Sequence, residues 1–267
     1  MARSAQRKKR AKDKRGKIII ALSCIGLAIL VSVPLIIKLN EIPYDEDTLC
    51  PLDRAYGHTV IMIDKTDPLT TIQEDALRNI IDRVKTEMAL YEKLSIYVLD
   101  DQNYSFPQPR FALCNPGKGE DASPIYQNPR LIQRRFEELF GSKVDAALDG
   151  IQLGDTRPHS PIMEMLRAIG SLNDFSNAYA PRRLIIFSDM LQHMPDYSHH
   201  SGIPDFEEFK KTEYAAFQRV DLSGVDINLI YLVREKTAKR QTNRHGFFWE
   251  QYFTWLGATL QEIRPIR

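Results

Sequence analysis

The stretch HTVIMIDKTDPLT, residues 58–70, places a run of apolar residues directly before a cluster of acidic and hydroxyl side chains. Its first half, residues 58–64, is a continuous apolar and β-branched run, which is typical of a strand buried on both faces of a sheet. Asp64 ends this predicted strand. An acidic residue in that position suits two roles: a nucleophile that accepts a phosphoryl group, or one ligand of a metal ion.

Further apolar runs alternate with helical patterns along the rest of the chain. We expect strands at 95–100, 110–114, 183–189, 226–233 and 260–266, the last at an edge, and helical segments at 71–94, 129–149, 160–172, 206–220 and 246–258. Such alternation predicts an α/β fold with a mostly parallel sheet covered by helices on both faces. Only nine residues, 101–109, separate the second and third strands. A parallel crossover needs a dozen or more, so the third strand is expected to be an antiparallel edge strand.

This arrangement resembles the von Willebrand factor type A (vWA) domain over about residues 57–266. The resemblance implies a Rossmann-like, six-stranded sheet in the order 3-2-1-4-5-6 with strand 3 antiparallel. The family's metal site uses D-x-S-x-S after the first strand, a Thr ahead of a later helix and an Asp after the fourth strand. The matching residues here are Asp64, Thr66, Ser160 and Asp189. Pro68 replaces the second Ser and has no hydroxyl group, and Asp67 is a candidate substitute ligand.

The expected site lies where the strand order reverses, since open α/β sheets bind ligands outside the carboxyl ends of their strands at that point. In this sheet, the expected binding point lies between the strands that end at Asp64 and Asp189. Two carboxylates and two hydroxyl groups are oxygen ligands that suit Mg²⁺ or Mn²⁺. In the family, an open metal position binds another protein, so the resemblance implies cation-assisted protein binding and no enzymatic role. Pro68 leaves a metal-free, degenerate vWA scaffold as an alternative.

A rival hypothesis starts from the same residues. DKTDPLT is close to the DKTGTLT phosphorylation motif of P-type ATPases, within the haloacid-dehalogenase-like superfamily. Asp64 would then be the nucleophile of a phosphatase or phosphotransferase. Asp67 and Pro68 replace the Gly and Thr of that motif, and Ser188 stands where a G-D-x-x-x-D motif needs Gly. No G-x-S-x-G, Walker, CxxC or HExxH motif occurs, so other hydrolytic chemistry has no motif support.

The N-terminal part predicts a membrane anchor. The twenty residues 18–37 carry no charge and are flanked by Lys17 and Lys38, and a helix of that length spans roughly 30 Å. We assign residues 1–17 as a basic cytoplasmic tail, 18–38 as a transmembrane helix, 39–57 as a linker and 58–267 as the vWA-like domain. The tail holds nine Lys and Arg against one acid. It therefore predicts a cytoplasmic N-terminus in the inner or plasma membrane, with a periplasmic or extracellular domain. No nucleic-acid partner is expected.

Two further side-chain groups carry predictions. Cys50 and Cys114 are the two cysteines of the predicted extracytoplasmic part, and an oxidising compartment makes them a candidate disulfide, with separate buried thiols as the alternative. An antiparallel third strand brings Cys114 toward the start of the first strand, and Cys50 lies in a linker that can fold across. His193, His199 and His200 show no fixed ligand spacing and are expected in an exposed loop. The aromatic residues of 246–258 are expected to pack in the core.

Overall fold

The computed structural model describes residues 17, 19–32, 35, 42–54, 56–100, 104–123, 127–151 and 157–267. The chain divides into two units, Met1–Pro43 and Tyr44–Arg267. In the first unit, residues 19–32 are helical. Among the described residues, no helix has the length and apolar character needed to cross a membrane. Parts of the predicted tail, transmembrane helix and linker lie outside the described residues, so the anchor stays a prediction.

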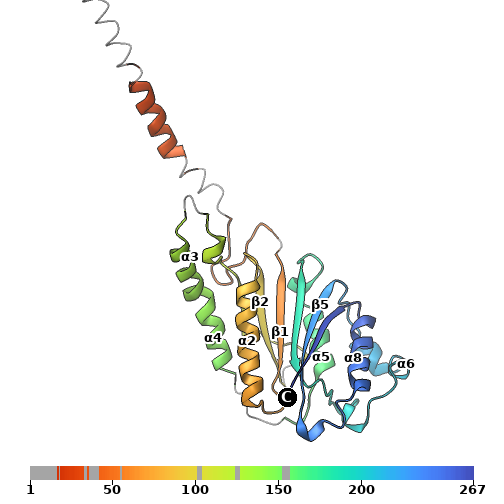
Figure 1. Cartoon of the computed structure of the whole chain (residues 1–267). Coiled ribbons are helices and arrows are strands. Elements are labelled where there is room, and N and C mark those ends of the chain that lie inside the picture. The colour runs from red at the N-terminus through yellow and green to blue at the C-terminus, as the bar shows by residue number, and fades with distance from the viewer. Residues whose placement is uncertain are drawn as a thin grey trace, which may run out of the picture. The chain divides into compact units, whose positions relative to one another are not determined.

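The second unit is built on one six-stranded sheet (Figure 1). Its strands are β1 (His58–Asp64), β2 (Lys93–Leu99), β3 (Phe111–Cys114), β4 (Arg182–Ser188), β5 (Val225–Leu232) and β6 (Thr259–Ile266). The order is β3-β2-β1-β4-β5-β6. Only the β2–β3 pair is antiparallel, and the other four pairs are parallel. Strand order and the antiparallel β3 are those expected from the sequence, and the fold is vWA-like.

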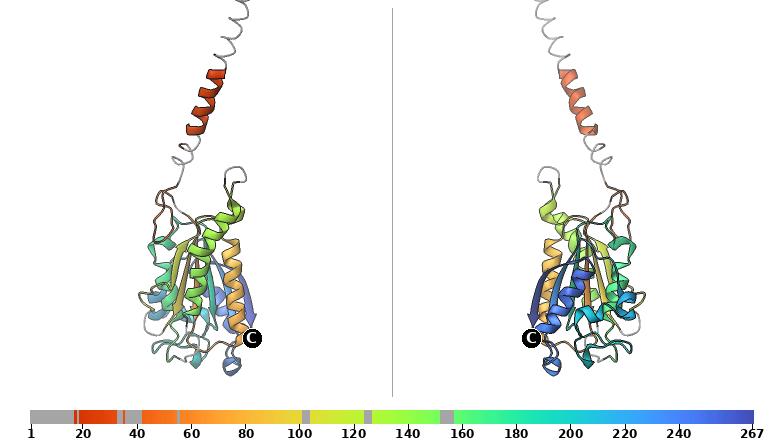
Figure 2. Two further views of the ribbon diagram at one scale, coloured as in Figure 1. Left: turned by 90° about the vertical axis from the view of Figure 1, so that its left-hand side faces the viewer. Right: turned by 90° about the vertical axis from the view of Figure 1, so that its right-hand side faces the viewer.

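Helices cover both faces of the sheet (Figures 1 and 2). One layer consists of α2 (Thr71–Glu87), α3 (Pro129–Phe136) and α4 (Ser142–Asp149), with the π-helical turn η2 (Glu137–Gly141) between the last two. The other consists of α5 (Ile162–Gly170), α6 (Phe206–Phe209), α7 (Glu213–Gln218) and α8 (Asn243–Trp255). Short 3₁₀ turns lie at η1 (Gly119–Asp121), η3 (Asn173–Phe175), η4 (His199–Ser201) and η5 (Glu235–Thr237).

Side chains of the central strands pack into two separate hydrophobic cores, one on each face of the sheet. Side chains alternate between the faces of a strand, so Val60 and Met62 enter the core under α5–α8, whereas Ile61 and Ile63 enter the core under α2–α4. All seven residues of β1 are buried, which explains its continuous apolar sequence. The aromatic residues of α8 also pack in the core as predicted, with the exception of Phe247, which is 62% exposed.

Four predicted helices differ in detail, one of them only by a shift of 246–258 to Asn243–Trp255. The segment 71–94 begins as predicted, with Thr70 and Gln73 forming a capping box, but it ends at Glu87. The segment 206–220 forms two short helices because Thr212 caps a new start at α7. The segment 160–172 begins two residues later than predicted and ends two residues earlier, since Pro161 is the cap residue and α5 runs from Ile162 to Gly170. Ser160 lies one residue before the cap, and its backbone pairs with His193 in a β-bridge.

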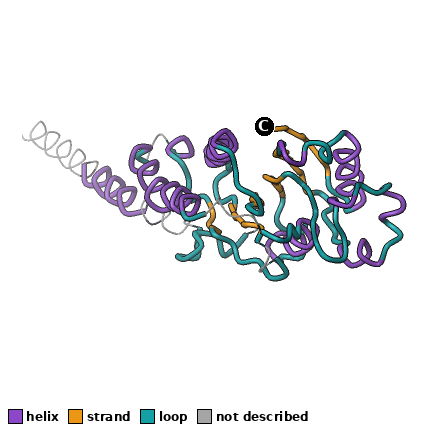
Figure 3. The backbone as a smooth tube through the Cα atoms, turned by 90° about the horizontal axis from the view of Figure 1, so that it is seen from below, coloured by secondary structure: helices purple, strands orange, loops and turns teal. Residues whose placement is uncertain are grey.

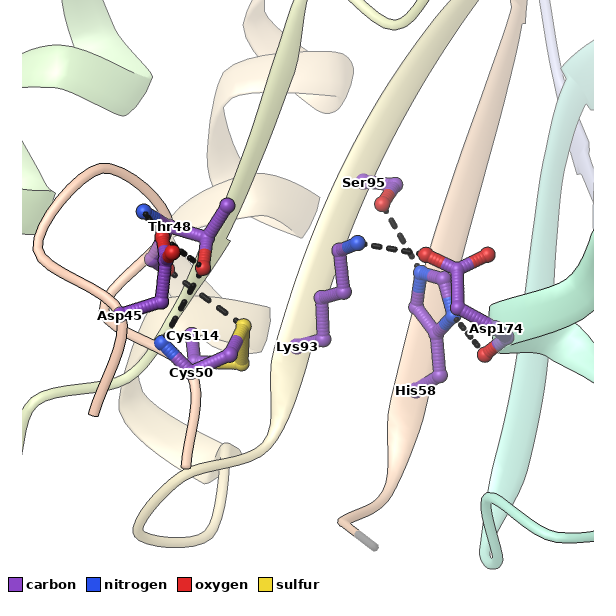
Figure 4. Close-up of a disulfide and its surroundings, with 8 residues drawn as sticks. All are labelled: Asp45, Thr48, Cys50, His58, Lys93, Ser95, Cys114 and Asp174. Atoms are coloured by element: carbon purple, nitrogen blue, oxygen red, sulfur yellow. Dashed lines mark hydrogen bonds and ion pairs between the residues drawn. A yellow bond between two sulfur atoms is a disulfide. The ribbon is translucent and has the colours of Figure 1, made fainter. Parts of the chain in front are cut away.

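The predicted disulfide is confirmed (Figure 4). Cys50 and Cys114 are 64 residues apart in sequence, and their Cα atoms are 4.9 Å apart. The segment before Cys50 turns back on itself, since the Asp45 carboxylate accepts hydrogen bonds from the Thr48 amide and hydroxyl, each at 2.7 Å. The Cys114 amide then donates to the Thr48 carbonyl at 2.8 Å. These bonds place the linker beside the last residue of β3, within reach of its sulfur.

A polar cluster stabilises the amino-terminal edge of the sheet (Figure 4). His58 is fully buried, and its ring nitrogens bond the Asp174 carbonyl at 2.7 Å and the Ser95 hydroxyl at 2.8 Å. Burial lowers the pKa of His58, although the Asp174 contacts oppose this. Lys93 forms an ion pair of 2.5 Å with the Asp174 carboxylate. This edge therefore holds η3 against β1 and β2 through buried hydrogen bonds.

Candidate functional site

Asp64 is the last residue of β1, at the carboxyl-terminal edge of the sheet that Figure 3 views from below. Its side chain is buried, with the residue 1% exposed. One carboxylate oxygen accepts from the Thr66 amide at 2.9 Å and the Thr66 hydroxyl at 2.6 Å. The other accepts from the Ser188 hydroxyl at 2.7 Å. Thr66 thus contacts Asp64, whereas Ser188 enters the site without having been predicted there.

Asp189 directly follows β4 and is also buried. One of its oxygens accepts from the Leu191 amide at 2.9 Å, and the other lies 3.5 Å from Nε of Arg234. Burial, with the nearby Asp64 carboxylate as the second cause, raises the pKa of Asp189 to about 7, while Leu191 and Arg234 act in the opposite direction. The two aspartates therefore lie close enough for their charges to interact, as a reversal of strand order between β1 and β4 requires.

Ser160 reaches the same edge through its backbone. Its amide donates to the His193 carbonyl at 2.8 Å, and its carbonyl accepts from the His193 amide at 3.0 Å, in the loop that follows Asp189. The Ser160 hydroxyl is buried and has no hydrogen-bond partner among the described residues. Buried hydroxyl groups are usually bonded, so this oxygen is suited to an external ligand.

The loop after β1 is occupied by an arginine that sequence analysis did not single out. Arg234, two residues beyond β5, donates to the Pro68 carbonyl and, at 3.3 Å, to the Asp67 carbonyl. Asp67, the candidate substitute ligand, thus offers its backbone to an arginine. Its charge also contributes to the raised pKa of Asp189. Sequence analysis could have identified Arg234 from its position, because a charged residue just after a parallel strand lies at the ligand-binding edge of the sheet.

These residues fit the metal site implied by the resemblance only in part. The Ser160 hydroxyl has no partner among the residues described, but both Asp64 oxygens already accept hydrogen bonds and Asp189 faces a guanidinium group. Pro68 supplies no side-chain oxygen. Within the described residues, no three His, Cys, Asp or Glu side chains group together in a way that could hold a metal ion. In this arrangement the side chains do not fit a resident Mg²⁺ or Mn²⁺, and that cofactor stays a prediction.

The histidines after β4 divide into two groups. His193 and His200 stack with their ring centroids 4.5 Å apart. The prediction that His199 is exposed is wrong, since it is fully buried and bonds His245 at 3.1 Å. Burial lowers the pKa of His199 to about 3 and that of His245 to about 4. His199 packs edge-on against Trp249 of α8, so it belongs to the core and not to the site.

Comparison with known proteins adds little to this picture. No protein-family model matches the sequence, and no curated protein is similar to it. Among solved structures, the chain is similar to the crystal structure of the SpRpn10 VWA domain, with 10% identity and a TM-score of 0.39. The likeness covers 79% of this chain and 88% of that one. The assignment of a vWA-like fold therefore rests on the observed strand order and directions.

Proposed function

We propose that this chain is a single-pass membrane protein whose vWA-like domain binds another protein at the carboxyl-terminal edge of its sheet, without enzymatic activity. The domain would lie outside the inner or plasma membrane and act in an envelope assembly or adhesion system. One observation carries the proposal: two buried carboxylates, Asp64 and Asp189, interact at the reversal of strand order, on the same edge as the Ser160 hydroxyl, which has no hydrogen-bond partner within the part of the chain that the structure describes. The proposed binding is assisted by a positive charge between the two carboxylates, which Mg²⁺, Mn²⁺ or a protein group would supply.

The rival role of Asp64 as a phosphoryl acceptor has weaker support. A nucleophilic carboxylate needs an oxygen that can approach the phosphorus atom. Thr66 holds one Asp64 oxygen through two hydrogen bonds, and Ser188 holds the other. Each hydrogen bond lowers the availability of the oxygen lone pairs. A phosphatase activity that disappears in Asp64→Asn would favour the rival role over protein binding.

Site-directed photo-crosslinking in native membranes tests the binding face. Lys236, exposed in η5 beyond β5, places a crosslinker at the proposed face, while Leu90, exposed between α2 and β2, is the matched position at the opposite edge. We expect one discrete adduct from position 236, none from position 90, and loss of the adduct in Asp64→Asn. Equal adducts from both positions, or an adduct unaffected by Asp64→Asn, would contradict the proposal.

The location of the domain has a separate test. The Cys50–Cys114 disulfide supports an oxidising compartment, because cytosolic thiols are kept reduced. Alkaline extraction should leave the full chain in the membrane fraction and release a chain that starts at residue 42. Thiol labelling of intact cells should modify Cys50 and Cys114 only after reduction. With a reagent that crosses the membrane, efficient labelling without reductant would show free thiols and contradict the oxidising location.

A further inference from the structure

We propose that Arg234 supplies the positive charge that a divalent cation supplies in the family this chain resembles, so that the site works without a metal. The proposal starts from the contacts of its guanidinium group. Nη1 donates to the Pro68 carbonyl and lies 3.4 Å from the Gln73 side-chain oxygen, and Nη2 donates to the Asp67 carbonyl. Nε faces an Asp189 oxygen at 3.5 Å. Arg234 therefore bridges the β1 loop, the first turn of α2 and the residue that ends β4.

The position of Arg234 is fixed by a second side chain. Its amide donates to the Gln241 side-chain oxygen at 2.8 Å. The Gln241 side-chain nitrogen donates in turn to the Asp189 carbonyl at 3.2 Å and to the Leu232 carbonyl at 2.6 Å. One glutamine thus ties the backbone of the arginine to the backbone of the aspartate that it faces. Arg234 is 12% exposed, so its charge acts inside the site and not in bulk water.

Two buried carboxylates in one site need a cation or a proton between them. Arg234 meets part of this need at Asp189: its Nε lies 3.5 Å from that carboxylate, and although burial and Asp64 raise the pKa of Asp189, the charge of the guanidinium group acts to lower it. A Mg²⁺ or Mn²⁺ ion bound to Asp189 would share one carboxylate with that guanidinium, and two cations at such distances repel each other. The arginine and a metal ion are therefore competitors for Asp189.

Pro68 fits the same explanation. In the family that this chain resembles, the position of Pro68 holds a Ser whose hydroxyl group binds the metal. Proline has no such hydroxyl group. Proline keeps a carbonyl oxygen, and that oxygen accepts a hydrogen bond from Arg234. The departure from D-x-S-x-S and the presence of Arg234 are thus one exchange, in which a hydroxyl and a metal ion are replaced by a carbonyl and a guanidinium. A consequence that rests on the proposed function is that partner binding should survive chelators.

Calorimetric titration of MnCl₂ and MgCl₂ into the full chain in detergent micelles tests the proposal. The wild type should show no saturable binding. Arg234→Ala should bind Mn²⁺ with a dissociation constant of about 1 mM or below, in the range of weak oxygen-ligand sites, and Arg234→Ala/Asp189→Ala should lose it. Arg240→Ala is the matched control, because Arg240 lies in the same segment, is exposed and bonds the His200 carbonyl. It should behave as the wild type.

The wild-type titration decides the question even if Arg234→Ala fails to fold. Saturable wild-type Mn²⁺ binding that Asp189→Ala abolishes would overturn the proposal. A folded Arg234→Ala variant with unchanged melting temperature and no Mn²⁺ binding would overturn it as well. No partner protein is present in these titrations. Their outcome is therefore independent of the crosslinking experiment that tests the proposed function.

Discussion

Removal of the Cys50–Cys114 disulfide should destabilise the domain by a predictable amount. The bond closes a loop of 64 residues, and the chain-entropy relation gives about 4 kcal/mol for a loop of that length at 25 °C. Cys50→Ala/Cys114→Ala removes the cross-link without placing a hydroxyl group in a buried position, since both cysteines are buried. The bonds from Thr48 to the Asp45 carboxylate and from the Cys114 amide to the Thr48 carbonyl involve no sulfur atom and should remain.

Urea unfolding followed by tryptophan fluorescence provides the assay, because Trp249 is fully buried in the core. With an m-value of roughly 2–3 kcal/mol/M, a loss of about 4 kcal/mol lowers the midpoint by roughly 1.5 M. Cys24→Ala is the control, since Cys24 is a free cysteine outside the vWA-like domain and should leave the midpoint unchanged. A midpoint shift below about 0.3 M in the double variant would refute the loop-closure reasoning.

Three further predictions concern groups away from the site. Burial lowers the pKa of His199 to about 3 and that of His245 to about 4, so below pH 6.5 the unfolded chain takes up protons before the folded chain does. The free energy of unfolding should therefore fall as the pH is lowered, with a loss of roughly 3 kcal/mol from His245 alone by pH 4. A urea midpoint that stays constant between pH 7 and 4.5 would contradict this. Glu164→Gln should lower stability by about 2 kcal/mol, measured by urea unfolding, because the buried carboxylate accepts three hydrogen bonds, including one of 2.6 Å from Tyr214; an unchanged midpoint would show that these bonds contribute nothing. Gly170→Ala should cost about 1–3 kcal/mol, seen as a lower melting temperature, since the added carbon would lie 2.7 Å from a valine methyl group, whereas a higher melting temperature would mean that helix propensity outweighs the clash.

The parts of the fold that the sequence predicts are those set by local patterns. A strand buried on both faces must be apolar throughout, and this identifies β1, since all of its residues are buried. The antiparallel direction of β3 follows from a connection too short for a crossover. The order of the strands, which puts the ends of β1 and β4 side by side, is implied by the resemblance to the vWA domain, and with that order the convergence of Asp64 and Asp189 follows from topology. The position of β1 and the direction of β3 are thus the parts that local patterns predict without the resemblance.

The rest of the site depends on contacts between distant segments, which have no local signature. Arg234 donates to the Pro68 carbonyl although the two residues are 166 positions apart in sequence, and no local sequence pattern at either residue predicts that bond. Ser160 looks like a helix cap in sequence because serine before proline is a common helix start. Its backbone is instead taken by His193, which pairs with it only after the sheet forms. His199 is polar, and its burial is visible only once α8 packs over it.

The two edges of the sheet are stabilised in opposite ways, and this difference supports placing function at the carboxyl-terminal edge. At the amino-terminal edge, a covalent cross-link and a satisfied cluster around His58 and Asp174 hold the chain. At the carboxyl-terminal edge, burial and repulsion from Asp64 oppose the ionised form of Asp189 more than Arg234 favours it, and the Ser160 hydroxyl has no partner among the described residues. Such unfavourable terms lower stability unless something else compensates them. Because both features coincide with the reversal of strand order, where open α/β sheets bind ligands, this edge is the better candidate for the binding face.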